Sequence, residues 1–162
     1  MSRPWRVMVI GSVDSGKTTL LGVLSDKAVR TVKTESIDFC GDFVDTPGEF
    51  LDIPLHYNSL ISTSSKASVV LLLVDPTRNC PPPPTFSSVI CAPIVGVVTK
   101  SDLASSEQIE RAKKSLRRSG VRESCVISSV TGEGLEFLKS TMERYRPTSY
   151  EDGKLKQEVS SE

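Results

Sequence analysis

The segment Gly-Ser-Val-Asp-Ser-Gly-Lys-Thr, residues 11–18, restricts the possible folds of this chain more than any other feature. It follows a short, mostly apolar segment at residues 5–10 and leads into residues 16–26, which have the composition of a helix. Its two glycines let the backbone wrap tightly, so that several amide N–H groups converge on one anion. The sequence therefore predicts a strand, a phosphate-binding loop and a helix in succession, which is the P-loop arrangement.

Individual side chains of this loop have separate expected roles. Lys17 is expected to reach the terminal phosphates of a nucleotide, and the Thr18 hydroxyl to join the ligands of Mg²⁺. Asp14 is either solvated or holds a monovalent cation such as K⁺ beside the phosphates. The alternative for the whole segment is a glycine turn followed by a helix with an exposed lysine. The expected phosphate-binding residues are Gly11, Val13, Asp14, Ser15, Gly16, Lys17, Thr18 and Thr19.

The rest of the chain alternates between apolar runs and helix-like segments. Runs of consecutive apolar residues predict strands at residues 5–10, 68–75, 93–99 and 125–128. Helices are expected at residues 16–26, 55–64, 105–119 and 134–144, and a weaker strand pair at residues 36–39 and 42–45. Because strands covered on both faces belong in a parallel sheet, this order predicts a three-layer α/β P-loop NTPase domain with a mostly parallel, doubly wound sheet.

Length and charge indicate one soluble domain. The 162 residues suffice for a single compact domain, expected at residues 1–145 and followed by a polar, disordered tail at residues 146–162. The 20 basic and 20 acidic side chains balance, so no general field attracts nucleic acid or a membrane surface. The apolar run near the start is too short for a signal peptide or a bilayer span, which predicts a cytoplasmic protein. Wide spacing favours buried, reduced thiols for Cys40, Cys80, Cys91 and Cys125.

A second motif, Asp-Thr-Pro-Gly at residues 45–48, follows the weak strand pair. Alone it is a good turn sequence. After a P-loop, Asp45 is expected to bind Mg²⁺ through water, and the Gly48 amide to donate to the third phosphate of a nucleotide. Gain or loss of that phosphate would order or release the segment that follows. Thr34 or Thr31 could complete the Mg²⁺ ligands, and Thr34 is favoured because it precedes the weak strand.

Two further motifs follow the last two predicted strands. Thr-Lys-Ser-Asp at residues 99–102 resembles the Asn-Lys-x-Asp element of GTPases, in which a carboxylate, here Asp102, accepts from the ring N–H and the exocyclic amine of guanine. Lys100 would lay its stem over the base. Residues 128–130 match the position of the Ser-Ala-Lys element, whose backbone amide meets the guanine carbonyl. The expected base-binding residues are Thr99, Lys100, Asp102, Leu103, Ser128, Ser129 and Val130.

With these elements the sequence resembles the TRAFAC class of small GTPases, and more closely the ethanolamine and propanediol utilisation family, EutP and PduV. The closer resemblance rests on Asp-Thr-Pro-Gly-Glu-Phe running into Pro54 and Tyr57, on the brief segment ending at Thr34, and on the sequences of residues 93–103 and 128–138. It covers roughly residues 6–142, nearly everything except the tail.

The resemblance implies a GTP- and GDP-binding protein with slow, Mg²⁺-dependent hydrolysis. It also implies an association with bacterial microcompartments, through their shell or enzyme proteins. An acetate kinase activity has been proposed for members of this family, so a phosphotransferase is the rival enzyme. A third possibility is a scaffold that keeps its nucleotide without turnover.

Three positions depart from the patterns of related GTPases. Thr99 replaces asparagine, so the side-chain amide that normally ties the base to the P-loop is lost, and we expect weaker nucleotide binding. Glu49 stands where Ras-like proteins carry the glutamine that orients the attacking water. Val13 replaces a glycine and narrows access for an inserted residue. Lys17, Thr34 and Glu49 are the catalytic candidates, and hydrolysis is expected to be slow unless a partner supplies a missing group such as an arginine.

Overall fold

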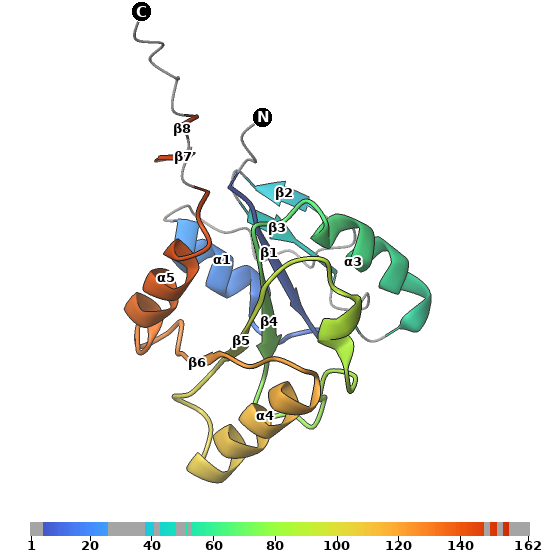
Figure 1. The fold of residues 1–162 in the computed structure, drawn as a ribbon. Coiled ribbons are helices and arrows are strands. Elements are labelled where there is room, and N and C mark those ends of the chain that lie inside the picture. Colours follow the sequence, from blue (N-terminus) through green and yellow to red (C-terminus); the bar gives the residue numbers. More distant parts are fainter. Residues whose placement is uncertain are drawn as a thin grey trace, which may run out of the picture.

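A computed structural model describes residues 5–25, 38–40, 43–47, 51, 53–147, 150–151 and 154–155. In this part of the chain, six strands form one sheet in the order β2-β3-β1-β4-β5-β6 (Figure 1). The strands are β1 (Val7–Gly11), β2 (Asp38–Cys40), β3 (Phe43–Asp45), β4 (Val69–Val74), β5 (Ile94–Val98) and β6 (Ser124–Val126). All neighbours pair in parallel except β2, which pairs antiparallel with β3. The predicted mostly parallel sheet is thus confirmed.

The helices follow the strands as the sequence predicted. Among the described residues they include α1 (Lys17–Ser25), α3 (Tyr57–Ser64), α4 (Ser106–Arg118) and α5 (Leu135–Glu143), and the 3₁₀ turns η1 (Pro54–His56) and η2 (Phe86–Val89). Helix α4 begins with a capping box, in which the Ser105 hydroxyl accepts from the Gln108 amide and the Gln108 side chain accepts from the Ser105 amide. The segment expected to be helical at residues 55–64 differs at its start, where η1 precedes the α-helix.

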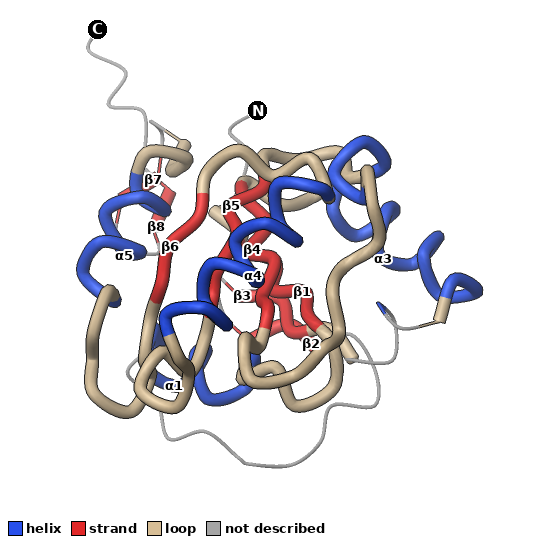
Figure 2. Tube along the Cα trace, turned by 90° about the horizontal axis from the view of Figure 1, so that it is seen from below, coloured by secondary structure: helices blue, strands red, loops and turns tan. Residues whose placement is uncertain are grey.

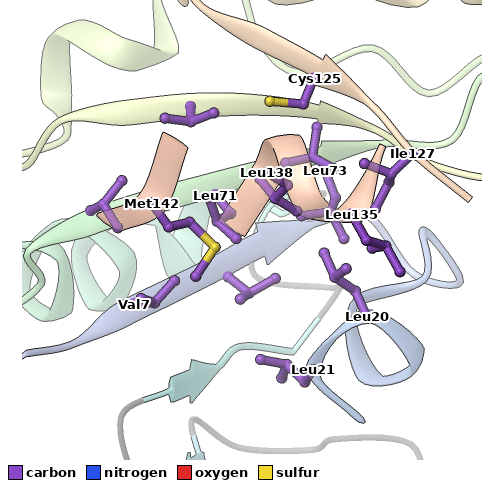
Figure 3. Packing of buried hydrophobic residues seen from close by; sticks show 14 of the residues in the cluster. Val7, Leu20, Leu21, Leu71, Leu73, Cys125, Ile127, Leu135, Leu138 and Met142 are labelled. Carbon is purple, nitrogen blue, oxygen red and sulfur yellow. The ribbon is translucent and has the colours of Figure 1, made fainter. Parts of the chain in front are cut away.

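Helices cover both faces of the sheet (Figures 1 and 2). On one face, side chains of α1 and α5 such as Leu20 and Leu138 pack with Val7 and Leu71 of the strands (Figure 3). On the other face, Leu60 of α3 and Leu116 of α4 belong to a second cluster of buried side chains. Successive strand residues point to opposite faces of the sheet. Because both faces are covered, every residue of β4 is buried. This double burial explains why the strands are apolar at consecutive positions.

The strand register aligns the expected functional positions along one edge of the sheet. Val9 of β1 pairs with Asp45, and Gly11 pairs with Leu73 of β4. Val74 pairs in turn with Val98 of β5, just before Thr99. The carboxyl ends of these parallel strands therefore meet at the edge where ligands bind in open α/β sheets.

The cysteines differ in burial. Cys125 in β6 is buried, and burial raises the pKa of its thiol above the ordinary value. Cys80 and Cys91 are exposed, so the expectation of buried thiols was wrong for these two. Both lie in the connection between β4 and β5 rather than in a strand, which leaves them outside the core. Cys40 lies in β2.

The end of the domain is held against its beginning. The Arg146 guanidinium lies 4.9 Å from the centre of the Trp5 ring, a cation–π contact next to β1. Farther along, within the segment expected as a polar tail, β7 (Tyr150–Glu151) pairs antiparallel with β8 (Lys154–Leu155). Among the described residues, the structure has no helix with the length and apolar character needed to cross a membrane.

Candidate nucleotide-binding site

The loop between β1 and α1 has the backbone conformation of a tight anion-binding turn. Asp14 and Gly16 both have positive φ, 61° and 100°. The Ser15 amide donates to the Ser12 carbonyl at 3.1 Å, which closes the turn. A side chain at Gly11 would approach the Leu73 backbone within 3.1 Å and collide with Ser15, so this position requires glycine. The sequence pattern of residues 11–18 therefore forms the curved loop that it predicted.

Side chains from two other strand ends hold this loop from outside. Arg78 Nη1 donates to the Val13 carbonyl at 2.9 Å, and Lys100 Nζ donates to the Asp14 carbonyl at 2.7 Å. The Thr99 hydroxyl donates to the Ser15 carbonyl at 2.7 Å. These hydrogen bonds fix the orientation of three consecutive peptide groups.

The orientation of those carbonyls determines where the amides point. In a trans peptide the N–H is opposite the C=O, so the N–H groups that follow the three held carbonyls point away from Arg78, Lys100 and Thr99. They include the amides of Asp14 and Gly16. The Ser15 amide is used within the loop, and the amide dipoles of Asp14 and Gly16 are those expected to bind phosphate.

Lys17 contributes a buried positive charge at the first turn of α1. Its side chain is nearly covered, and its ammonium donates to the carbonyls of Gly11 at 2.8 Å and Ser12 at 2.9 Å. The helix begins at this residue, so the positive end of its dipole adds to the ammonium charge. The alternative for this segment, a glycine turn followed by a helix with an exposed lysine, was wrong because Lys17 is buried.

The described part of the expected Mg²⁺ site consists of oxygen ligands. Asp45 is buried at the end of β3, and its neighbour Thr46 donates to the Val9 carbonyl at 2.8 Å, which anchors this segment beside β1. Thr18 lies half-buried in the first turn of α1. Carboxylate and hydroxyl oxygens are the hard donors that Mg²⁺ prefers, so these side chains fit the ion. Thr31, Thr34, Gly48 and Glu49 lie outside the described residues.

The two motifs expected to bind a base lie together. The Ser128 hydroxyl donates to Asp102 Oδ1 at 2.8 Å and accepts from the Thr131 amide at 3.1 Å. Beside them, the Ser101 hydroxyl donates to Glu133 at 3.0 Å. Asp102 is therefore held in one orientation while remaining exposed to a ligand.

Apolar and polar residues flank Asp102 and Ser128 in the two motifs. Leu103 and Val130 follow the two motifs and are 70% and 81% exposed, which leaves their apolar side chains available to a flat ring. Ser129 is half-buried between Ser128 and Val130. Lys100 has a positive φ of 54°, and its ammonium turns to the P-loop and to Asp75.

Thr99 lacks the asparagine amide, as the sequence showed, but its hydroxyl makes another contact with the P-loop. Thr99 is buried directly after β5, and its hydroxyl lies close enough to the Ser15 carbonyl to donate at 2.7 Å. A side chain shorter than asparagine can make this contact because the carboxyl end of β5 lies beside the loop. The link between base motif and phosphate loop is retained through a hydroxyl.

Sequence reasoning missed the turn after β4. Asp75 accepts from the Thr77 amide at 2.9 Å, from the Thr77 hydroxyl at 2.6 Å and from Lys100 at 2.8 Å. Burial raises the pKa of the Asp75 carboxyl, but the hydrogen bonds from Lys100 and Thr77 outweigh burial, so this pKa lies below its ordinary value of 3.8. An aspartate placed directly after a buried strand was the available signal. No local signal marks Arg78, whose P-loop partner is 65 residues away.

The sheet order and this edge site define the class: a domain with the fold of P-loop GTPases. A solved structure with the same fold is translation elongation factor SelB from Methanococcus maripaludis in complex with the GTP analogue GppNHp. Its TM-score is 0.65 at 23% identity, covering 89% of this chain. This chain spans about a third, 34%, of the SelB structure.

Sequence comparison then gives the family. Residues 4–144 match the family described as "Ethanolamine utilisation - propanediol utilisation" (PduV-EutP), and the chain belongs to it. It is 30% identical to propanediol utilization protein PduV of Citrobacter freundii over 134 residues, 82% of this chain and 89% of the relative. It is 28% identical to probable acetate kinase EutP of Escherichia coli K12 over 123 residues, 73% of this chain and 76% of the relative.

Proposed function

We propose that this protein binds GTP and GDP with Mg²⁺ and hydrolyses GTP slowly. The observation that carries the proposal is the set of hydrogen bonds from Arg78, Lys100 and Thr99 to consecutive P-loop carbonyls, which leaves the Asp14 and Gly16 amides directed to the opposite side, where a phosphate chain would bind. The SelB structure, which has the same fold, contains a GTP analogue and supports this choice of ligand.

Guanine preference in this proposal comes from Asp102. Its carboxylate can accept two hydrogen bonds side by side, from the ring N–H and the amine of guanine, whereas adenine has no matching ring donor. The hydrogen bond from Ser128 holds the carboxylate in place before the base arrives. Leu103 and Val130 would lie against the base.

Catalysis would be mainly positioning and charge stabilisation. Lys17, the P-loop amides and the start of α1 would stabilise negative charge on the transferring phosphate. Mg²⁺, held by Thr18, Asp45 and Thr34, would neutralise phosphate charge when bound. Water would attack in line, and Glu49 is a poor substitute for a neutral glutamine beside that charge. Turnover should therefore be slow until a partner supplies a further group.

The family membership supports a role in ethanolamine or propanediol utilisation. We propose that the nucleotide state changes the conformation of residues 31–57, and that shell or enzyme proteins of a microcompartment read this change. The protein would then be cytoplasmic and located at such a compartment.

A second activity is favoured by the name of the Escherichia coli relative, probable acetate kinase. Transfer of the terminal phosphate to acetate would form acetyl phosphate. Incubation with acetate, GTP or ATP and Mg²⁺ separates the two activities, because release of inorganic phosphate alone supports the GTPase and acetyl phosphate supports the kinase. Nucleotide binding with neither product would support the scaffold.

Calorimetry with GTP, GDP and ATP in Mg²⁺ tests the base preference. The protein should prefer guanine nucleotides, and Asp102→Asn should lose that preference while still binding phosphate. The control is Ser140→Ala on the exposed surface of α5, which should bind like the unmodified protein. Equal binding of ATP and GTP by the unmodified protein would contradict the proposal.

A further inference from the structure

Arg78 reaches the P-loop at two neighbouring residues. Its Nη1 atom donates to the Val13 carbonyl at 2.9 Å and lies 3.8 Å from Asp14 Oδ2. The Arg78 side chain is 48% exposed and the Asp14 side chain 80% exposed, so both are open to solvent and to a ligand. A charged side chain from the end of β4 thus lies against the outer side of the P-loop, opposite the amides expected to bind phosphate.

The turn that carries Arg78 is rigidly built. Asp75 is almost fully buried, with a side chain 5% exposed, and it accepts two hydrogen bonds from Thr77. The Arg78 amide donates back to the Asp75 carbonyl at 3.3 Å. Lys100 pairs with the same carboxylate and also holds the Asp14 carbonyl. The backbone of Arg78 is therefore held close to the sheet edge, and the guanidinium is held by its contact with the P-loop.

The chemistry at this point is that of a small cation site. A backbone carbonyl oxygen and a carboxylate oxygen on adjacent residues are the hard donors that a monovalent metal ion would take. A guanidinium also places a permanent positive charge on such oxygens, and its five N–H groups let it hold both. Without a cation there, the Asp14 charge would repel phosphate in the loop.

We propose that Arg78 is a positioning residue that takes the place of a monovalent metal ion at Val13 and Asp14. Phosphate binding in this protein then does not depend on K⁺. A surface ion pair of little consequence would instead predict no effect of Arg78→Ala in any salt. The proposal rests on the proposed nucleotide binding, and the experiment separates the two.

The test measures GTP affinity and hydrolysis in KCl, NaCl and N-methylglucamine chloride at equal ionic strength. The unmodified protein should give the same values in all three salts. Arg78→Ala should bind GTP about tenfold more weakly in N-methylglucamine, as expected for loss of a charged hydrogen bond. K⁺ or millimolar guanidinium should restore much of the lost GTP affinity. A purely structural role of Arg78 would not produce this recovery.

Two further variants make the result decisive. Arg78→Lys keeps the charge and should remain independent of the salt, which also covers the case in which Arg78→Ala folds poorly. Arg122→Ala, an exposed arginine next to the amino end of β6, is the matched control and should behave like the unmodified protein. Equal salt dependence of the unmodified protein and Arg78→Ala would overturn the role of Arg78. Absence of GTP binding by the unmodified protein in every salt would instead overturn the proposed function, and this inference with it.

Discussion

The Thr99 hydroxyl donates a hydrogen bond of 2.7 Å to the Ser15 carbonyl and so joins the end of β5 to the P-loop. Both residues are buried, so the bond is shielded from water. Through this contact the part of the site expected to bind the base and the part expected to bind phosphate become one rigid unit. Weakening the contact should therefore affect stability and nucleotide binding together.

Replacement of Thr99 by valine tests that coupling. The two side chains have similar shapes, but valine leaves the Ser15 carbonyl without its buried donor, which should lower the free energy of unfolding by about 1–3 kcal/mol. Guanine nucleotide affinity should fall as well. Urea unfolding and calorimetry measure the two effects. Thr99→Ser, which keeps the hydroxyl, is the control, and a valine variant as stable as the serine variant would show that the bond contributes nothing.

Asp75→Asn should change how stability depends on pH. Because the folded-state pKa of Asp75 lies below its ordinary value of 3.8, the carboxylate stabilises the protein above that pH. This contribution is lost as the pH falls below 3.8 and through the lower folded-state value. The stability difference between the natural protein and Asp75→Asn, measured by urea unfolding, should shrink over that window. A difference that stays constant with pH would contradict the role of the charge.

Leu138→Ala tests the core between α5 and the sheet. Leu138 is fully buried, so its truncation should cost about 2–5 kcal/mol of folding free energy. Phe137→Ala is the matched control, since the neighbouring ring is 60% exposed and its loss should change stability by about 0.5 kcal/mol or less. Thermal or urea unfolding distinguishes the variants. Similar losses in both would show that α5 packs differently.

Ser128→Ala should weaken the preference for guanine. Without the Ser128 hydroxyl, Asp102 loses the hydrogen bond that holds its carboxylate in one orientation. GTP and GDP affinity should fall about three- to tenfold, while ATP binding changes little. Competition binding with the three nucleotides measures this. A parallel drop for all three would indicate a general loss of structure in the loop.

Strands and helices were predictable because their signals are local. Consecutive apolar residues predicted strands covered on both faces, as in β4, and the two P-loop glycines predicted the turn after β1. Contacts between distant segments carried no such signal. Neither the hydrogen bond from Arg78 to Val13 nor the one from Thr99 to Ser15 follows from residue type or spacing, because each depends on which strand ends become neighbours. The expected catalytic residues Thr34 and Glu49 stay predictions.

Titration of GTP with Mg²⁺ into the natural protein and into Lys17→Ala tests the central claim most directly. Lys17 places a buried ammonium on the P-loop carbonyls, so its removal should weaken GTP binding by at least about tenfold. Circular dichroism should show that the variant remains folded, and Lys66→Ala, an exposed lysine beyond α3, should bind like the natural protein. The account predicts saturable binding that depends on Lys17. Equal affinity of the natural protein and a folded Lys17→Ala variant, or no binding by either, would contradict it.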